Sequence, residues 1–359
     1  MNQVELKNVS KVFTTKKLGS ITAVNNFSLN IKKGECFSFL GPSGCGKTTT
    51  LRMIAGFEDL SEGEIHIAGE PVSVKSKNLY IPPENRNLGM VFQAFAVWPH
   101  LNVFDNVAFP LQVQKIAKSE IKERVMKALE QTNLVEQANV FPSDLSGGEQ
   151  QRIALARAIV VNPGVLLLDE PLSNLDPKLR ESMRFEIKRL QVEYGFTIIF
   201  VTHDQSEALA LSDRIMVMDK GEIVQIDTPQ NIYNHPINRF VHNFLGESNF
   251  TSVDIKDNKV YFSGSGVEID LGIEPQDNMI LATRPSEIII NREEGYQGTV
   301  VQRSILSDFT EYLVKIGNQT LQVQASHSDL FELNEDCYIK LVNPVWYDQN
   351  DHVIKTNKE

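Results

Sequence analysis

The feature that constrains this chain most is the segment from Gly41 to Thr48, which reads Gly-Pro-Ser-Gly-Cys-Gly-Lys-Thr. It fits the phosphate-loop pattern of a glycine, four residues of any kind, and then Gly-Lys-Ser/Thr. A short apolar run, Cys36–Leu40, precedes it and predicts a buried strand, while a helical pattern follows from Thr49 to Ala55. Strand, glycine loop and helix is the context that the motif requires, and a glycine-rich turn with a chance lysine does not explain it.

The loop predicts a site for the phosphates of a nucleotide. Its glycines let backbone N–H groups close around a phosphate, and the N-terminus of the following helix adds a fixed positive field. We expect Lys47 to reach the β- and γ-phosphates and the Thr48 hydroxyl to hold Mg²⁺. The residues predicted to form this site are Gly41, Pro42, Ser43, Gly44, Cys45, Gly46, Lys47, Thr48 and Thr49.

Length, charge and cysteine content narrow the class of protein. The 359 residues suggest two or three domains, and the net charge of −11 argues against a general nucleic-acid binder. The 3 cysteines are too few for a disulfide framework or a zinc site, so we expect a reduced, cytosolic chain. The first residues do not fit a secretory signal, and no apolar run approaches the roughly 20 residues that span a bilayer. Any membrane role would therefore require a partner.

Polar side chains follow three predicted strands. Val165–Asp169 reads as a buried strand, with Glu170 next in the chain. Asp169 suits a Mg²⁺ contact, and Glu170 suits a base that polarises the attacking water, although adjacent acids can also be solvated strand caps. Gln93 ends a strand and could approach Mg²⁺ or that water, but a surface glutamine is the commoner explanation. His203 ends another strand and could face the γ-phosphate, whereas a lone histidine is usually structural.

A second helix start with anion-binding character lies at Ser146, within the segment Asp144–Arg152. Two glycines, Gly147 and Gly148, follow the serine at the beginning of a well-formed helical pattern. Ser146 with Glu149 three residues on is also an ordinary capping box. The capping box explains the helix but not the paired glycines.

Two aromatic features have open interpretations. Phe13 could stack on adenine or be an ordinary half-buried strand residue. Residues 94–112 contain several aromatic side chains, and their prolines are expected to limit regular structure, so the segment is either a docking surface or a small satellite core. The residues concerned are Phe95, Trp98, Phe104 and Phe109, with Pro99 and Pro110.

The last third of the chain has a different pattern. Residues 227–250 read as a mostly polar, helical connector. Beyond residue 251, short alternating strands punctuated by turn residues are predicted at 260–262, 268–271, 279–282, 287–290, 298–301, 312–316, 320–323 and 338–341. Many short strands at this spacing predict a small barrel or sandwich. We find no phosphate, metal or nucleophile constellation in this part of the sequence.

Together these motifs resemble the ATPase subunit of ATP-binding-cassette (ABC) transporters, and the resemblance covers nearly all of the chain. The most specific motif is Leu145-Ser-Gly-Gly-Glu-Gln150, which occurs with the phosphate loop, Gln93, Asp169-Glu170, the 173–176 loop and His203 in the family's order. The resemblance implies an α/β P-loop NTPase domain over residues 1–240, with a RecA-like core and a helical subdomain at about 94–157. It also implies a small all-β, OB-like regulatory domain over residues 241–359.

The resemblance further implies a head-to-tail homodimer. Each ATP, with Mg²⁺ held by Thr48, Gln93 and Asp169, would lie between one subunit's phosphate loop and the other's helix start. Phe13 would stack on adenine, Asp176 would bridge the subunits and His203 would hold the γ-phosphate. The second subunit's contacts to ATP would come from Ser146, Gly147, Gly148 and Glu149.

The same resemblance implies partners and a cargo class. The aromatic segment would receive a cytoplasmic helix from one of two transmembrane permease subunits, at the cytoplasmic face of the cell membrane. An extracytoplasmic solute-binding protein would act indirectly, and no nucleic acid would be bound. Residues 283–287 are similar to a motif in the regulatory domain of importers of iron(III), polyamines, sugars and related solutes, with a serine between the motif's Pro and Glu. Residues 96–100 are similar to iron(III)-type and polyamine-type importers, and we predict iron(III) or a polyamine as cargo. Sugar, phosphonate or sulfate import and a non-transport ABC ATPase are the alternatives.

Overall fold

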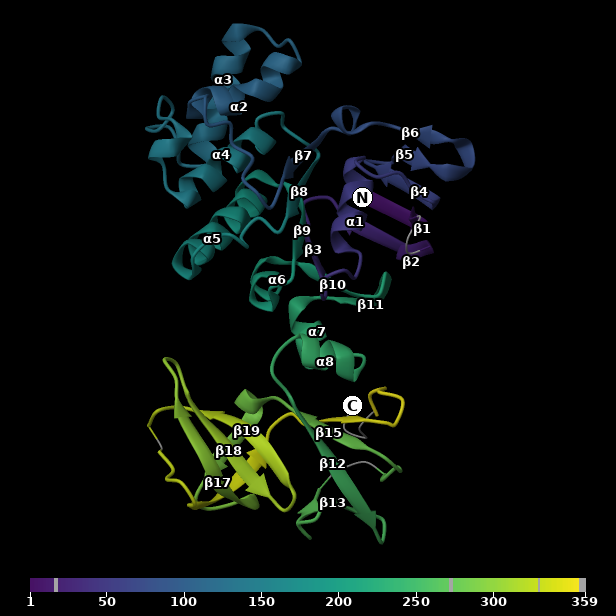
Figure 1. Ribbon diagram of the computed structural model, residues 1–359, viewed down its shortest axis with the longest axis vertical. Coiled ribbons are helices and arrows are strands. Elements are labelled where there is room, and N and C mark those ends of the chain that lie inside the picture. Colours follow the sequence, from purple (N-terminus) through teal and green to yellow (C-terminus); the bar gives the residue numbers. More distant parts are fainter. Residues whose placement is uncertain (16–18, 271–273, 329, 355–359) are drawn as a thin grey trace. The chain divides into compact units, whose positions relative to one another are not determined.

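The computed structural model describes residues 1–15, 19–270, 274–328 and 330–354 (Figure 1). Its contacts divide the chain into two compact units, Met1–Ile232 and Tyr233–Glu359. This division falls earlier than the expected boundary at residue 240. Arg284 in the second unit explains the difference, because its guanidinium donates to the carbonyl oxygens of Tyr233 and His242 at 3.2 and 3.4 Å.

The central sheet of the first unit has six strands in the order β11-β10-β3-β9-β8-β7. All neighbours are parallel except β10 and β11. Because the carboxyl ends of parallel strands share one edge, the loops after β3, β8 and β9 emerge together there. The strands are β3 (Cys36–Leu40), β7 (Leu88–Val91), β8 (Val165–Asp169), β9 (Thr197–Thr202), β10 (Arg214–Asp219) and β11 (Glu222–Asp227).

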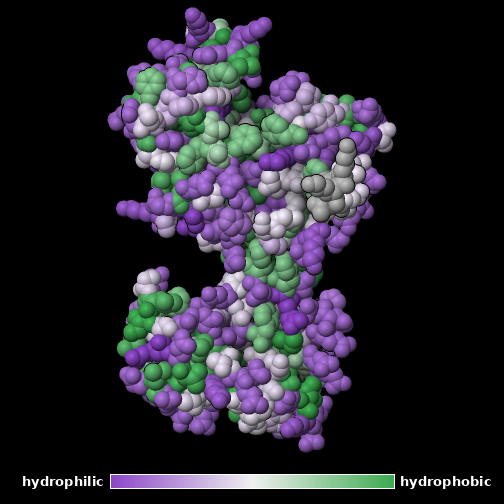
Figure 2. Space-filling model, in the orientation of Figure 1, coloured by the Kyte–Doolittle hydropathy of each residue, from purple (hydrophilic) through white to green (hydrophobic). Residues whose placement is uncertain are grey.

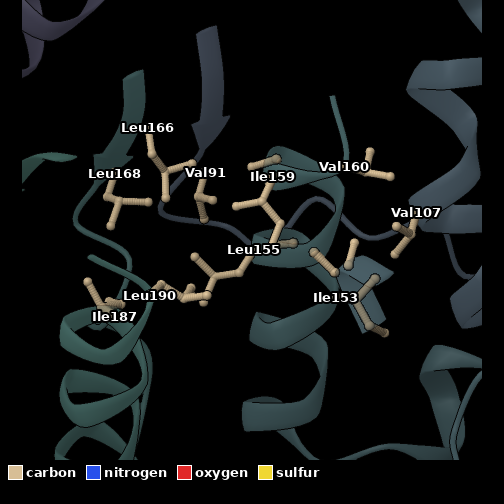
Figure 3. Packing of buried hydrophobic residues seen from close by; sticks show 14 of the residues in the cluster. Val91, Val107, Ile153, Leu155, Ile159, Val160, Leu166, Leu168, Ile187 and Leu190 are labelled. Carbon is tan, nitrogen blue, oxygen red and sulfur yellow. The ribbon is translucent and has the colours of Figure 1, made fainter. Parts of the chain in front are cut away.

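Each face of this sheet packs into its own core. Leu166 and Leu168 of β8 belong to one apolar cluster, and Val165 and Leu167 belong to the other. Burial on both faces explains why β8 is a continuous apolar run rather than an alternating one. Figure 3 shows the first cluster, in which Leu155 and Ile159 lie beside Val91 of β7 and Leu166 of β8.

A second sheet of the first unit is antiparallel, in the order β2-β1-β4-β5-β6. It shares the second core with α1 (Lys47–Ala55), the helix that follows the phosphate loop. Strands β4 and β5 pair as an antiparallel hairpin. The strands are β1 (Asn2–Thr15), β2 (Gly19–Lys32), β4 (Glu62–Ile67), β5 (Glu70–Val74) and β6 (Leu79–Tyr80).

Three helices, α2 (Val103–Val113), α3 (Lys118–Gln131) and α4 (Gly147–Ile159), pack together within the first unit. The predicted limit on regular structure near Pro110 is wrong, because this proline lies inside α2. Pro110 lacks the N–H that would donate to the carbonyl oxygen of Asn106, and the helix forms despite this loss, with Asn102 capping its N-terminal end. Two more helices follow, α5 (Pro177–Tyr194) and α6 (Gln205–Leu211).

In the aromatic segment, residues 94–112, some aromatic side chains are buried and others are exposed. Phe95 and Phe104 pack against the first core, as a satellite core requires. Phe109 is 39% exposed, and Trp98 lies against it with ring centroids 4.5 Å apart. The fully buried Asn106 holds the preceding loop in place, since its side chain bonds the backbone N–H and carbonyl of Trp98 at 2.9 and 3.1 Å.

The second unit contains α8 (Arg239–Phe244) and two five-stranded sheets, β14-β13-β12-β15-β21 and β16-β20-β17-β18-β19. Helix α7 (Pro229–Asn234) crosses the division between the units. One apolar core is shared by the two sheets, so this unit is all-β apart from its first helices and short 3₁₀ turns. The expected strand at 268–271 is found as Glu268–Ile269, and Leu271 lies outside the described residues.

The strands of this unit are β12 (Asn249–Lys256), β13 (Lys259–Phe262), β14 (Glu268–Ile269), β15 (Ile280–Thr283), β16 (Ile288–Asn291), β17 (Tyr296–Ile305), β18 (Thr310–Ile316), β19 (Gln319–Ala325), β20 (Asp336–Leu341) and β21 (Val345–Tyr347). The sequence missed β12, which alternates weakly, and β21, which is only 3 residues long. Across the described parts of both units, no helix combines the length and apolar character needed to cross a bilayer.

Candidate nucleotide-binding site

The phosphate loop adopts a conformation that only glycine tolerates at two positions. Gly41 and Gly46 have φ of 156° and 109°. A Cβ on Gly41 would lie 2.3 Å from the Met218 carbonyl oxygen, and one on Gly46 would lie 2.4 Å from that of Ala23. Gly46 is also the N-cap of α1 and supplies no capping side chain, so the first N–H groups of the helix remain available to an anion.

We expect Gly46→Ala to abolish ATP binding, because the methyl group cannot fit without moving the loop away from Ala23. Gly69→Ala is the matched control, since Gly69 has φ of 86° but no heavy atom within 4 Å of the place that an added methyl group would take. Both variants carry the strain of a left-handed alanine, and only Gly46→Ala adds the clash. Equilibrium ATP binding by both variants tests this; equal affinities would show that the close approach is unimportant.

Lys47 lies with its amine against the loop that it follows. Its Nζ donates to the carbonyl oxygens of Gly41 and Pro42 at 2.6 and 2.9 Å, and the side chain is buried. The amine therefore sits at the centre of the loop, where a phosphate cradled by the N–H groups would meet it. An ammonium group in this position is a point charge suited to phosphate.

Cys45 is inside the same loop, 3% exposed and 3.8 Å from Lys47 Nζ. Burial raises the pKa of its thiol, so alkylation is expected to be slow. We expect protein carrying a bulky alkyl group on Cys45 to lose ATP binding, because the group would occupy the phosphate cradle. Mass spectrometry verifies the adduct, and the same reagent on Cys45→Ala controls for Cys36 and Cys337. Retained ATP binding by the verified adduct would contradict this prediction.

Thr48 and Asp169 bring two oxygen ligands together. Thr48 Oγ1 donates to Asp169 Oδ1 at 3.2 Å, so the helix after β3 meets the end of β8. Burial raises the pKa of the Asp169 carboxyl, while the Thr48 hydrogen bond opposes this shift. A hydroxyl and a carboxylate fit Mg²⁺, which takes few protein oxygens and completes its shell with phosphate and water. The described residues contain no group of three acidic, histidine or cysteine side chains that could hold a metal alone.

Glu170, Gln93 and His203 converge at the same edge of the sheet. His203 Nδ1 lies 3.2 Å from Glu170 Oε2, and Gln93 Nε2 lies 3.5 Å from the same oxygen. Glu170 has a left-handed backbone, with φ of 46°, which is costly for a residue with a side chain. Its N–H donates to Val201 O at 2.9 Å, and Ser173 Oγ donates to its carbonyl oxygen at 2.9 Å. The carboxylate is thus held in a fixed place.

Ser146 begins α4 with the expected capping box. Its Oγ accepts from Glu149 N at 3.4 Å, and its own N–H donates to Glu149 Oε2 at 2.9 Å. Ser146 Oγ also donates to Glu149 Oε2 at 2.7 Å, and this bond, followed by the one from the Ser146 N–H, holds the pKa of the Glu149 carboxyl below its usual range. The structure supplies a reason for Gly148, since a Cβ there would lie 2.4 Å from Leu179 Cδ1. Gly147 has no such constraint, and Ser146 is exposed.

Asp176 and Phe13 lie on separate elements. Asp176 is exposed and caps α5, its Oδ1 accepting from Leu179 N at 3.0 Å. Phe13 on β1 is half-buried, and Lys11 Nζ lies 4.8 Å from its ring centroid. The structure therefore joins the phosphate loop, Asp169, Glu170, Gln93 and His203 into one site. The partners found for Ser146 and Asp176 are within their own helix starts.

Sequence reasoning missed two arginines that shape the site's surroundings. Arg157 of α4 donates to the carbonyl oxygens of Phe95 and Ala96 and lies 4.5 Å from the Trp98 ring centroid, so it fixes the loop after Gln93. The buried Arg86 donates to the carbonyl oxygens of Met53 and Ile54 at the end of α1. No local sequence signal distinguishes these arginines from surface ones.

A phosphate loop ending in a buried lysine, a hydroxyl–carboxylate pair and a fixed glutamate together define an ATPase of the P-loop class. Comparisons with known proteins narrow this class. A family model described as "ABC transporter" matches residues 24–173. The spermidine/putrescine import ATP-binding protein PotA of Clostridium novyi is 45% identical over 318 residues, covering 88% of each chain.

Two further comparisons agree. The trehalose/maltose import ATP-binding protein MalK of Thermococcus litoralis is 49% identical over 254 residues, covering 71% of this chain and 67% of that protein. A solved dimeric ATP-binding cassette in a post-hydrolysis state with ADP and phosphate is 35% identical, with a TM-score of 0.54, covering 63% of this chain and 98% of that one. The chain belongs to the ATP-binding subunits of ABC importers, and it is an ATPase whose reaction is coupled to transport.

Proposed function

We propose that this chain powers a polyamine importer. It would act as a homodimer bound to two transmembrane permease subunits, peripherally on the cytoplasmic face of the membrane, with a solute-binding protein delivering cargo outside. The single observation that carries the ATPase part of the proposal is the convergence of Glu170, His203 and Gln93 at the sheet edge. The polyamine part is supported by the relative from Clostridium novyi, which matches over both units.

The proposed chemistry follows from the charges at this edge. Lys47 and the N–H groups of the loop bind the β- and γ-phosphates and balance the negative charge that develops during cleavage. Glu170 accepts a hydrogen bond from the attacking water and orients it in line with the γ-phosphate. His203 holds a γ-phosphate oxygen. Thr48, Asp169 and Gln93 would hold Mg²⁺, which would supply positive charge to neutralise the phosphates.

The proposed homodimer accounts for the second helix start. Ser146 is exposed and Gly147 is unconstrained, so the start of α4 can receive an anion from outside its own subunit. The solved cassette described above is itself dimeric. Placing this helix start and Asp176 against the partner's phosphate loop would complete each ATP site. Phe13 would stack on adenine from the loop's own subunit.

The proposed permease contact lies on the aromatic surface of the first unit. Phe57 and Phe92 are 51% and 39% exposed, with ring centroids 6.0 Å apart, and Phe109 is exposed to a similar degree. Figure 2 shows apolar side chains gathered on this unit among hydrophilic ones. Exposed aromatics of this kind suit an apolar helix of a membrane subunit.

The cargo can be tested by transport. Deleting the gene should abolish uptake of labelled spermidine or putrescine, and the wild-type chain should restore it, whereas Glu170→Gln should not. Uptake of labelled maltose and of labelled iron(III) is measured in the same cells for comparison. Maltose is included because a sugar-import relative also matches this chain. Iron(III) is included because the sequence predicted it as a cargo, although none of the relatives described supports it. Restored uptake of maltose or iron, with polyamine uptake unaffected, would overturn the polyamine assignment.

A further inference from the structure

A charged cluster lies directly behind His203. Arg180, in the first turns of α5, reaches α6 and the loop before it. Its Nη1 lies 3.4 Å from Asp204 Oδ2, and its Nε lies 3.6 Å from Glu207 Oε1. Nothing in the ATP-binding motifs requires an arginine here. Both carboxylates lie within ion-pair distance of the guanidinium, although its Nε has no hydrogen-bond partner, so α5 is joined to the residues that follow β9 mainly by charge.

The carboxylates hold the backbone on both sides of His203. Glu207 is 3% exposed, and its Oε2 accepts from Thr202 Oγ1 at 2.6 Å. The same hydroxyl accepts from Asp204 N at 3.0 Å. The residues immediately before and after His203 are therefore tied to each other and to the buried acid, which fixes where the imidazole can stand. His203 in turn lies 3.2 Å from Glu170.

The opposite side of Arg180 holds the loop that ends at Asp176. Nη2 donates to the Leu175 carbonyl oxygen at 3.3 Å, and the Arg180 N–H donates to the Asp176 carbonyl oxygen at 2.8 Å. A small cavity of about 30 Å³ separates this arginine from Glu170 and His203. A cavity of that size accommodates about one water molecule, so little stands between the cluster and the reacting groups.

We propose that Arg180 is a positioning residue for ATP hydrolysis, linking the 173–176 loop to the loop that carries His203. The inference deepens the proposed function and rests on it, because Asp176 lies at the subunit seam only if the homodimer forms as described. A shift of the 173–176 loop when the proposed homodimer closes would then be transmitted to His203 through the Arg180 side chain. The planar guanidinium fork suits this task, since it meets a carbonyl and two carboxylates at once, whereas an ammonium group cannot hold all three in a fixed geometry.

The test compares steady-state ATPase kinetics of Arg180→Met, Arg180→Lys and the matched control Arg189→Met. Arg189 lies on the same helix, pairs with Glu186 and Glu193 and donates to the Gln131 carbonyl oxygen, but it is not part of the cluster around His203. We expect Arg180→Met to lower kcat about ten- to a hundredfold, with KM for ATP within about twofold, because the phosphate loop is untouched. Arg180→Lys should recover only part of kcat. Arg189→Met should keep kcat within about twofold of wild type.

Thermal unfolding and ATP affinity of each variant separate positioning from stability. The proposal is supported if Arg180→Met loses kcat while its unfolding midpoint and its ATP affinity match those of Arg189→Met. Equal kcat in the two variants, full recovery in Arg180→Lys, or a kcat loss that only follows a lowered unfolding midpoint would overturn it. The proposed function fails separately, if the wild-type chain hydrolyses ATP at the same rate as Glu170→Gln.

Discussion

Replacing Glu170 by Gln is expected to lower ATP turnover about a hundredfold or more while leaving ATP binding unchanged. Glutamine keeps the size of the side chain but cannot accept the proton of the attacking water. The carboxylate stands within reach of His203 and Gln93, and its backbone is held by Val201 and Ser173, so the substitution should not disturb the loop. Phosphate release in single and multiple turnovers measures the rate, and nucleotide titration measures affinity.

The matched control is Glu193→Gln, which removes a half-exposed carboxylate that pairs with Arg189 on α5. It should hydrolyse ATP at about the wild-type rate. In the proposed homodimer the two subunits would separate only after ATP is cleaved, so Glu170→Gln should also accumulate as an ATP-bound dimer. A wild-type turnover rate in Glu170→Gln would remove this residue from the role of base.

Replacing Lys47 by Met is expected to weaken ATP binding about thirtyfold or more. The amine is buried against the carbonyl oxygens of Gly41 and Pro42, so it is already placed where the phosphates enter. Methionine retains the apolar length and loses the charge, which leaves the triphosphate without its cation. The rate of ATP hydrolysis at a limiting ATP concentration should fall by at least the same factor as the affinity for ATP.

Lys75→Met is the control for loss of a positive charge. Lys75 pairs with Asp59 at 2.8 Å on a half-exposed surface and should affect neither binding nor turnover. Equilibrium binding of ATP and of ADP to both variants provides the measurement. If Lys47→Met bound ATP like Lys75→Met, the nucleotide would have to be placed elsewhere on the chain.

The nucleotide site was largely predictable because its signals are local. Each predicted site residue in the core follows a strand, and the parallel sheet brings the ends of β3, β8 and β9 to one edge. Gly41 and Gly46 combine positive φ with neighbours too close for a side chain, so the sequence itself marks these two positions. The capping box at Ser146 and the apolar face of α3 are equally short-range patterns.

What could not be predicted depends on contacts between distant segments. Arg180 and Glu207 look like ordinary helix-surface charges in the sequence, and only the packing of α5 against α6 makes them a pair. The helix around Pro110 was missed because burial of Val107 and Leu111 outweighs the cost of one proline. Strand β12 was not predicted, because its partners, β13 and β15, come later in the chain.

Light scattering can measure the mass of Glu170→Gln with Mg²⁺ and ATP, with and without Ser146→Arg, and so test whether two subunits share each nucleotide. We expect a dimer for Glu170→Gln and an ATP-bound monomer once Ser146→Arg is added, because the exposed start of α4 would bind the partner's nucleotide. Ser119→Arg, at an exposed position on α3, should leave the dimer intact. A dimer that persists with Ser146→Arg, or a monomer that has lost ATP as well, would contradict a nucleotide shared between two subunits.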